Sequence, residues 1–245
     1  MRDPARPPAP DAPADQAGWP VGPMTFEEYL EFEEASEVRH EFVNGYAYPY
    51  PLDAPAASGG TRAHSRIILN VTLAVTVLHR ARGTGCETYS QGFKLRTPRE
   101  DTYYPDVMVS CGPVPPDDAL YLGDPCLAVE VLSPSTARTD VTEKYESYVE
   151  IPTLGAYLVV ESAWRAVHRH WRGEDGAWHT ETVTGADGAV PLPCPADGVL
   201  TLAEIYAGTS VPDDPPARAR LRRVKEGDPG YAYAADPDGA GPGAP

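Results

Sequence analysis

Residues 126–136, "CLAVEVLSPST", read as a β-strand followed by a turn. The strand part is apolar on both faces, which is typical of a central strand covered on two sides. Glu130 interrupts this pattern, and an ionised carboxylate is costly to bury unless another group binds it. Glu130 therefore either pairs with an arginine, lies at the end of the strand, or belongs to a functional site.

The composition excludes several classes of protein. The chain has 245 residues, is 42% hydrophobic and carries a formal net charge of -16. That charge argues against a general nucleic-acid coat protein, although it allows an enzyme with a local basic patch or with acids that hold divalent cations. There is no apolar window long enough for a membrane span, and the first residues do not resemble a secretory signal.

The cysteines give a further expectation about compartment. They are scattered along the chain and form no C-x-x-C pair: Cys86, Cys111, Cys126 and Cys194. Neither a zinc knuckle nor a disulfide framework is indicated by this spacing. We therefore expect reduced thiols and a cytoplasmic location.

The chain divides into one domain and two tails. Residues 1–23 and 211–245 are rich in Pro, Ala and Asp and lack periodicity, so both are predicted to be disordered. Residues 24–210 are predicted to form a single domain.

Local signals place the first elements of that domain. Thr25 and Glu28 have the spacing of a capping box, which predicts a helix start. Asn44-Gly45 lies between short aromatic and β-branched runs and predicts a hairpin turn. Residues 64–83 are apolar on almost every face and are predicted to be a long buried helix that ends at Gly83.

The second half alternates between strands and short helices. Strands are predicted at residues 92–97, 104–110, 126–133, 156–162, 165–172, 177–183 and 198–202. A helix is predicted near residues 140–150 and a brief helical piece at 203–208. This order predicts an α/β or α+β fold with a central mixed β-sheet. His168 and His170 lie on a predicted strand without an acid to complete a metal site, so they are expected at the surface.

Two further charged residues lie in unusual surroundings. Asp106 follows Pro105 and precedes an apolar run, which is also the pattern of an ordinary turn aspartate. Lys144 falls on the inward stripe of its helix, between Val141 and Tyr148. A lysine there either extends its ammonium to the surface or meets an anion inside the protein.

The three residues suggest a shared chemistry. Asp106 and Glu130 lie on neighbouring predicted strands, and the helix with Lys144 follows the second strand closely. Two converging carboxylates suit a hard divalent cation such as Mg²⁺ or Mn²⁺. With a nearby ammonium, they are the groups that metal-dependent phosphodiester hydrolysis requires.

At this point the sequence resembles the PD-(D/E)xK nuclease superfamily, and more closely the Uma-type restriction endonucleases of bacteria. The matching segments span about residues 24–205 and include "MTFEEYLEF", "RHEFVNG", "YPDVMV", "LAVEVLSPST", "DVTEKYESYVE" and "AYLVV". The most specific is "EVLSPST" followed by Asp140, Lys144 and Tyr148. The resemblance implies a restriction-endonuclease-like core, in which helices flank a central mixed sheet.

The resemblance also implies roles for individual residues. Asp106 and Glu130 correspond to the two acids of the motif. The usual lysine position holds Leu132, and the lysine role is expected to move to Lys144. Glu41, in "RHEFVNG", corresponds to an upstream glutamate and is expected to join the metal site, although strand alternation leaves open which face of its strand points inward.

The implied activity is Mg²⁺- or Mn²⁺-dependent endonucleolytic cleavage, with DNA as the expected substrate. His64 is a candidate for substrate contact or proton transfer, or else a locally bonded helix-start residue. Many nucleases of this superfamily dimerise to cut both strands, so a homodimer is one arrangement that the resemblance allows. The net charge and Tyr46, found where the family often has an acid, keep a second hypothesis open: a weakened or inactive nuclease-fold interaction protein.

Overall fold

The computed structural model describes residues 20–50, 60–132, 143–195 and 197–215, and the backbone of 221–222 and 232–233. Val21 forms a β-bridge with Ala47, and Val211 is buried. The chain at both predicted domain boundaries therefore belongs to the folded unit. Among the described residues, none of the helices combines the length and hydrophobicity that a membrane span needs.

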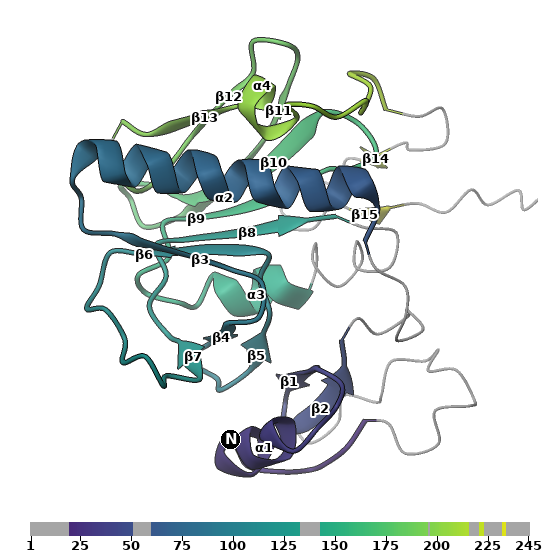
Figure 1. Ribbon diagram of the computed structural model, residues 1–245, viewed down its shortest axis with the longest axis vertical. Helices are drawn as coiled ribbons and strands as arrows, with labels where there is room; N and C mark the ends of the chain where they lie inside the picture. The colour runs from purple at the N-terminus through teal and green to yellow at the C-terminus, as the bar shows by residue number, and fades with distance from the viewer. Residues whose placement is uncertain are drawn as a thin grey trace, which may run out of the picture.

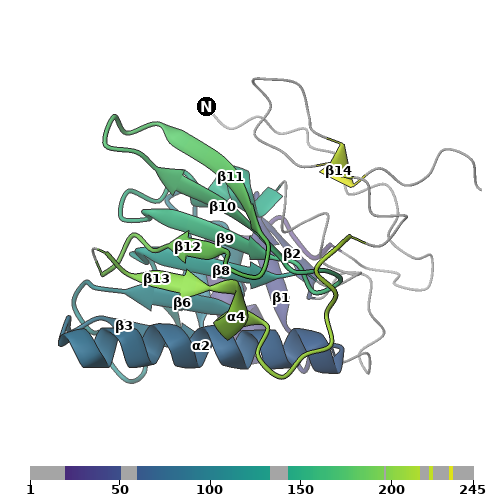
Figure 2. The same ribbon diagram turned by 90° about the horizontal axis from the view of Figure 1, so that it is seen from above.

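Within the described residues, six strands form the central sheet in the order β11-β10-β9-β8-β6-β3 (Figures 1 and 2). Their bounds are β3 (Glu87–Ser90), β6 (Val107–Ser110), β8 (Leu127–Val131), β9 (Ala156–Val160), β10 (Ala166–Arg172) and β11 (Trp178–Thr184). β8 and β9 run parallel and the other neighbours run antiparallel, so the sheet is mixed, as the sequence predicts.

Another five described strands form a second sheet in the order β2-β1-β5-β4-β7. They are β1 (His40–Val43), β2 (Tyr46–Pro49), β4 (Lys94–Arg96), β5 (Thr102–Tyr103) and β7 (Tyr121–Leu122). Two small ladders complete the described strands: β12 (Ala189–Pro191) with β13 (Val199–Thr201), and β14 (Leu221–Arg222) with β15 (Ala232–Tyr233). The last ladder falls within the segment that the sequence predicts to be a tail.

Helices cover both faces of the central sheet (Figure 1). They are α1 (Phe26–Glu34), α2 (Arg62–Arg82), α3 (Tyr145–Tyr148) and α4 (Leu202–Ile205). α2 packs on one face together with α4, whereas α3 lies on the other face, toward the second sheet. Each face therefore has its own apolar core, which explains why β8 is buried along its whole length.

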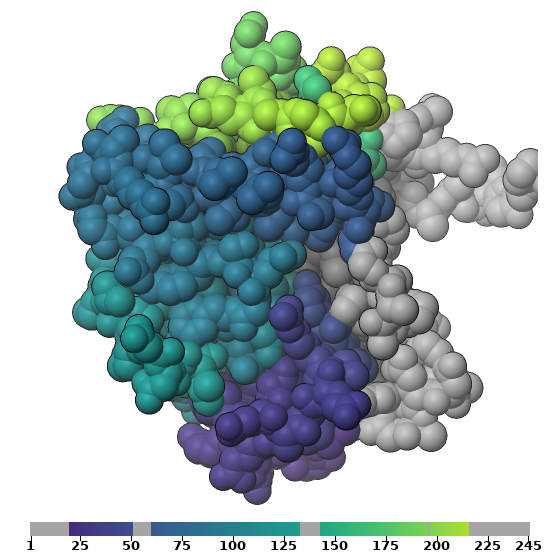
Figure 3. Space-filling view, viewed as in Figure 1, coloured from purple at the N-terminus to yellow at the C-terminus, as the bar shows by residue number. Residues whose placement is uncertain are grey.

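Helix α2 differs from its prediction in one respect. One side of it is buried in the core, but Leu69, Leu73 and Val77 on another side are 45–62% exposed. The helix runs across an open face of the molecule (Figure 3). Apolar composition alone did not reveal that only one side of this helix has a neighbour. The predicted cap is confirmed, since Gly83 ends α2 in the left-handed conformation.

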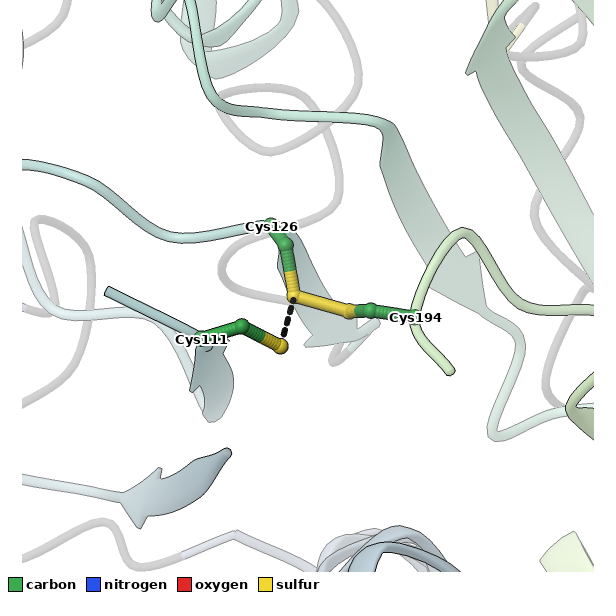
Figure 4. Close-up of side chains that lie close together, drawn as sticks. All are labelled: Cys111, Cys126 and Cys194. Atoms are coloured by element: carbon green, nitrogen blue, oxygen red, sulfur yellow. Dashed lines mark hydrogen bonds between the residues drawn. A yellow bond between two sulfur atoms is a disulfide. The ribbon is translucent and has the colours of Figure 1, made fainter. Parts of the chain in front are cut away.

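The cysteines also differ from their prediction. The structure joins Cys86 to Cys111 and Cys126 to Cys194 by disulfide bonds, and the second of these is drawn in Figure 4. The expectation of no disulfide framework is therefore wrong. The reason lies in strand register. β3 pairs with β6 through Glu87 and Ser110, so one further step places Cys86 opposite Cys111. Spacing along the chain does not show such pairings.

Candidate active site

Lys144 lies between two carboxylates inside the protein. Its Nζ is 2.9 Å from Oε1 of Glu130 and 3.1 Å from Oε1 of Glu41. All three residues are buried, with Lys144 fully covered. The amine thus meets anions inside the protein and does not reach out to solvent, and the acid within "LAVEV" has its partner.

The three groups come from three different elements. On β8, Leu127, Val129 and Val131 face the core beneath α2, whereas Glu130 shares the opposite face with Ala128. α3 covers that opposite face. Lys144 directly precedes α3 with helical backbone angles (φ -66°, ψ -38°). Residues 133–142, which include the "SPST" turn and Asp140, lie outside the described residues.

Strand β1 supplies Glu41, and helix α1 holds this strand in place. Tyr29 on α1 donates a hydrogen bond to the carbonyl oxygen of His40 (2.6 Å), and Glu33 accepts one from the His40 backbone N–H (3.0 Å). His40 and Phe42 contact aromatic rings of α1, which leaves Glu41 on the face that meets Lys144. The structure thereby decides which face of β1 carries the site.

Asp106 lies across the strand pair from Glu130. β6 pairs with β8 through Val107 and Val129, so one further step of the antiparallel register sets Asp106 opposite Glu130. Oδ2 of Asp106 accepts a hydrogen bond from the backbone N–H of Val131 at 2.8 Å. This bond fixes the carboxylate beside the end of β8, and Asp106 is only 7% exposed.

His64 adjoins the same strand end. Its Nε2 is 2.9 Å from the carbonyl oxygen of Val131 and 3.8 Å from Oδ2 of Asp106. Because a carbonyl oxygen only accepts, Nε2 carries the hydrogen in this contact. His64 sits in the first turn of α2, whose Thr61 N-cap accepts a hydrogen bond from the His64 backbone N–H.

Aromatic residues complete the surroundings of Lys144. The hydroxyl of Tyr148 donates a hydrogen bond to Oε1 of Glu130 at 3.1 Å. Burial, with Glu130 nearby, raises the pKa of the Tyr148 phenol well above its ordinary value, so the phenol stays a donor. The rings of Tyr50 and Tyr103 lie 5.1 and 5.9 Å from Nζ of Lys144. The sequence interpretation placed Tyr148 on the inward stripe and in the family motif but gave it no role in the site, although its i+4 spacing from Lys144 signals a shared helix face.

The donor set fits a hard divalent cation. Glu41, Asp106, Glu130 and the Val131 carbonyl all offer oxygen, the ligand atom that Mg²⁺ prefers. Three carboxylates against one ammonium leave two negative charges, which one such ion would balance. Among the described residues, these acids do not form a closed three-ligand cluster. Mg²⁺ does not need one, because it usually keeps several waters and binds one or two carboxylates.

Two histidines that were expected at the surface are buried instead. Nε2 of His168 lies 3.2 Å from Oε1 of Glu161, and the ring of His170 contacts the rings of Tyr145 and Tyr157. Alternation puts His168 and His170 on one face of β10, with Arg169 and Trp171 on the other, and the face with the histidines is buried. Neither histidine joins the candidate site.

Comparison with known proteins places the chain in a family. A family model described as "Uma2: Putative restriction endonuclease" matches residues 26–203. Two proteins of Synechocystis sp. (strain ATCC 27184 / PCC 6803 / Kazusa) are similar. "Uncharacterized protein slr1290" is 32% identical over 65% of this chain and 80% of its own. "Uncharacterized protein sll1609" is 27% identical over 68% of this chain and 91% of its own.

A solved structure has the same fold. It is titled as a putative nuclease belonging to DUF820 from Anabaena variabilis ATCC 29413, and it superposes with a TM-score of 0.60 at 18% identity. The match covers 75% of this chain and 98% of the other. At this identity the likeness concerns the fold, and it confirms the predicted restriction-endonuclease-like core of mixed strands and flanking helices. The match of the family model over most of the folded region shows that the chain belongs to the Uma2 family, whose model is described as a putative restriction endonuclease.

Proposed function

We propose that this protein is a divalent-metal-dependent endonuclease that hydrolyses phosphodiester bonds in DNA. The carrying observation is the buried contact of Lys144 with Glu130 and Glu41, beside Asp106. Burying three carboxylates with only one ammonium lowers the stability of the fold. Such clusters of buried charged groups are typical of functional sites. The family description supports a nuclease, and the choice of DNA rests on that description.

The residues have distinct roles in this proposal. Asp106 and Glu130 would hold Mg²⁺ or Mn²⁺, with Glu41 beside them. The bound ion would supply a water of lowered pKa and polarise the phosphate. Lys144 would stabilise the charge that develops on the phosphate oxygens. Tyr148 would keep Glu130 oriented through its hydrogen bond, and His64 would contact the substrate near Asp106.

Plasmid nicking tests this function. The full chain, purified with EDTA and then supplied with Mg²⁺ or Mn²⁺, should convert supercoiled plasmid to the nicked form. EDTA should stop the reaction. Asp106→Asn keeps the shape of the side chain but removes the charge, and it should abolish nicking.

A matched control separates this site from contamination. Asp117 is exposed, and Asp117→Asn purified in the same way should nick at the wild-type rate. Equal rates for Asp106→Asn and the wild type would contradict the proposal, since the activity would then come from another site or another protein.

A non-catalytic interaction protein on the same scaffold is the competing candidate. The formal net charge of -16 favours it, because strong negative charge opposes DNA binding. Calorimetry with Mn²⁺ discriminates between the two functions. An active site should give saturable heat that Glu130→Gln removes, whereas a vestigial site should give none.

A further inference from the structure

Four cysteines from separate parts of the chain meet at one end of the central sheet. We call Cys86, Cys111, Cys126 and Cys194 the four-cysteine cluster. Cys86 precedes β3, Cys111 follows β6 and Cys126 precedes β8, while Cys194 belongs to the loop between β12 and β13. The backbone N–H of Cys126 donates to the Val109 carbonyl oxygen at 2.8 Å, which holds this strand start beside the end of β6.

The two disulfides of the cluster touch each other. The Sγ atoms of Cys111 and Cys126, which belong to different disulfides, are 3.6 Å apart (Figure 4). The Sγ atoms of Cys111, Cys126 and Cys194 all lie within 4.8 Å of one another. Cys86 is bonded to Cys111, so its sulfur adjoins the same group. Among the described residues, Cys111, Cys126 and Cys194 are the group of His, Cys, Asp or Glu side chains whose ligand atoms converge closely enough to hold a metal ion.

The spacing suits a tetrahedral zinc ion once the disulfides are reduced. Zinc binds thiolate sulfur at about 2.3 Å, which sets neighbouring sulfurs of a tetrahedron about 3.8 Å apart. The contact between Cys111 and Cys126 already has nearly this length. Within each disulfide, reduction pushes the two sulfurs apart toward a non-bonded distance of similar size. The sulfurs of Cys111, Cys126 and Cys194 would then surround one point with small movements of their side chains, and Cys86, whose sulfur adjoins that of Cys111, would supply the fourth ligand.

We propose that the reduced four-cysteine cluster is a structural Zn²⁺ site. Each disulfide takes two electrons and two protons from a dithiol reductant, which itself becomes a disulfide. The four resulting thiols then bind one Zn²⁺ and release up to four protons. Cys111 is exposed, so a reductant can reach the cluster from solvent. Zinc and the two disulfides are alternative links between the same segments.

The cluster is separate from the candidate active site. Glu130 lies four residues along β8 from Cys126, which corresponds to roughly 13 Å of extended strand. Asp106 precedes β6 whereas Cys111 follows it. A metal bound at the cluster is therefore distinguishable from one bound by the acids, and failure of either proposal leaves the other intact.

Zinc retention by the reduced full chain tests the proposal. The protein is treated with dithiothreitol under nitrogen, desalted, and checked for four reactive thiols. It then receives one equivalent of Zn²⁺ and passes through a second desalting column. We expect about one zinc per chain by mass spectrometry and none for the oxidised protein. Co²⁺ in place of Zn²⁺ should give the intense sulfur-to-cobalt absorption of tetrahedral thiolate sites.

Variants locate the metal. Cys126→Ser should lose the bound zinc, because the Cys126 sulfur is bonded to that of Cys194 and contacts that of Cys111. Asp106→Asn should retain the zinc. Failure of the reduced wild-type chain to retain zinc would overturn the proposal, as would loss of zinc in Asp106→Asn. The cobalt spectrum of the wild-type chain decides the question even when a serine variant does not fold.

Discussion

Lys144 shows how much one residue depends on its surroundings. A fully buried ammonium would be strongly destabilising alone, as would the carboxylate of Glu130, which is 1% exposed. Each compensates the other at 2.9 Å, with Glu41 as a second anionic partner. Removal of one member leaves the remaining charges buried without compensation, so stability and activity depend on the same contact.

Lys144→Met should therefore lower both the stability of the protein and its nuclease activity. Methionine has a similar length but no charge, and breaking a buried ion pair typically costs about 3–5 kcal/mol of unfolding free energy. Nicking should fall roughly 10²–10³-fold, the usual effect of losing one group that stabilises the transition state. Urea unfolding and plasmid assays measure the two effects. Lys94→Met is the control, because Lys94 is only half-buried and lies over the Tyr104 ring; a change below about 1 kcal/mol is expected there.

His170 predicts a dependence of stability on pH. Burial, with a smaller contribution from the neighbouring His168, lowers the pKa of His170 to about 3. The unfolded chain protonates this histidine near pH 6.5, whereas the folded chain keeps it neutral. The unfolded state therefore binds more protons between these values, and stability should fall as pH decreases from about 6.5 toward 3.

The slope of this effect is measurable. One such group contributes up to about 1.4 kcal/mol per pH unit. Urea midpoints at pH 7, 6 and 5 should decline less steeply in His170→Gln than in the wild type. Identical slopes for both proteins would mean that His170 titrates normally in the folded state.

At the scale of elements, the β1–β2 hairpin sets the position of Glu41. Asn44 and Gly45 form its turn with φ of 53° and 87°, as the Asn-Gly pair predicts. The register that follows sets Glu41 opposite Tyr48. The two-residue turn thus decides which side chains of β1 share a face.

Gly45→Ala should destabilise the protein by roughly 1–2 kcal/mol. A Cβ at Gly45 would meet only the Met24 carbonyl oxygen, at 3.5 Å, so the cost comes from the positive φ and not from a clash. Gly123→Ala is the matched control, because that glycine has no positive φ and its Cβ would find its nearest atom at 4.0 Å. Thermal unfolding of both variants checks the difference; equal losses would contradict a backbone origin.

At the scale of the whole molecule, the disulfides link distant segments. Cys86 and Cys111 are separated by 25 residues, and Cys126 and Cys194 by 68. The second bond ties the start of β8 to the loop beyond β12. A disulfide that closes a longer loop restricts the unfolded chain more strongly.

Two double variants test this ranking in the absence of zinc. Removing either disulfide by paired serine substitutions should lower the unfolding free energy by about 2–4 kcal/mol. Loss of Cys126–Cys194 should cost about 1 kcal/mol more than loss of Cys86–Cys111, because of the difference in loop length. Denaturant midpoints of the oxidised proteins measure both values. The reverse order would show that the folded state, and not the loops, dominates.

Local signals in the sequence determined the elements that depend on few residues. The capping box of Thr25 and Glu28, the Asn44-Gly45 turn and the Gly83 cap are all present as predicted, because each is decided by backbone preferences within a few residues. The covered strand β8 was also evident from its composition. The family motif directed attention to Glu41, whose place in the fold nothing local reveals.

Contacts between distant residues were decided by the tertiary structure alone. The sequence marked Glu130 as an acid that needed a partner, but only the packing of α3 and β1 against β8 brings Lys144 and Glu41 to it. The disulfides, the burial of His168 and His170, and the exposed side of α2 were misjudged for the same reason. Residue patterns record what a side chain prefers, whereas strand register and the packing of layers determine which neighbours it receives.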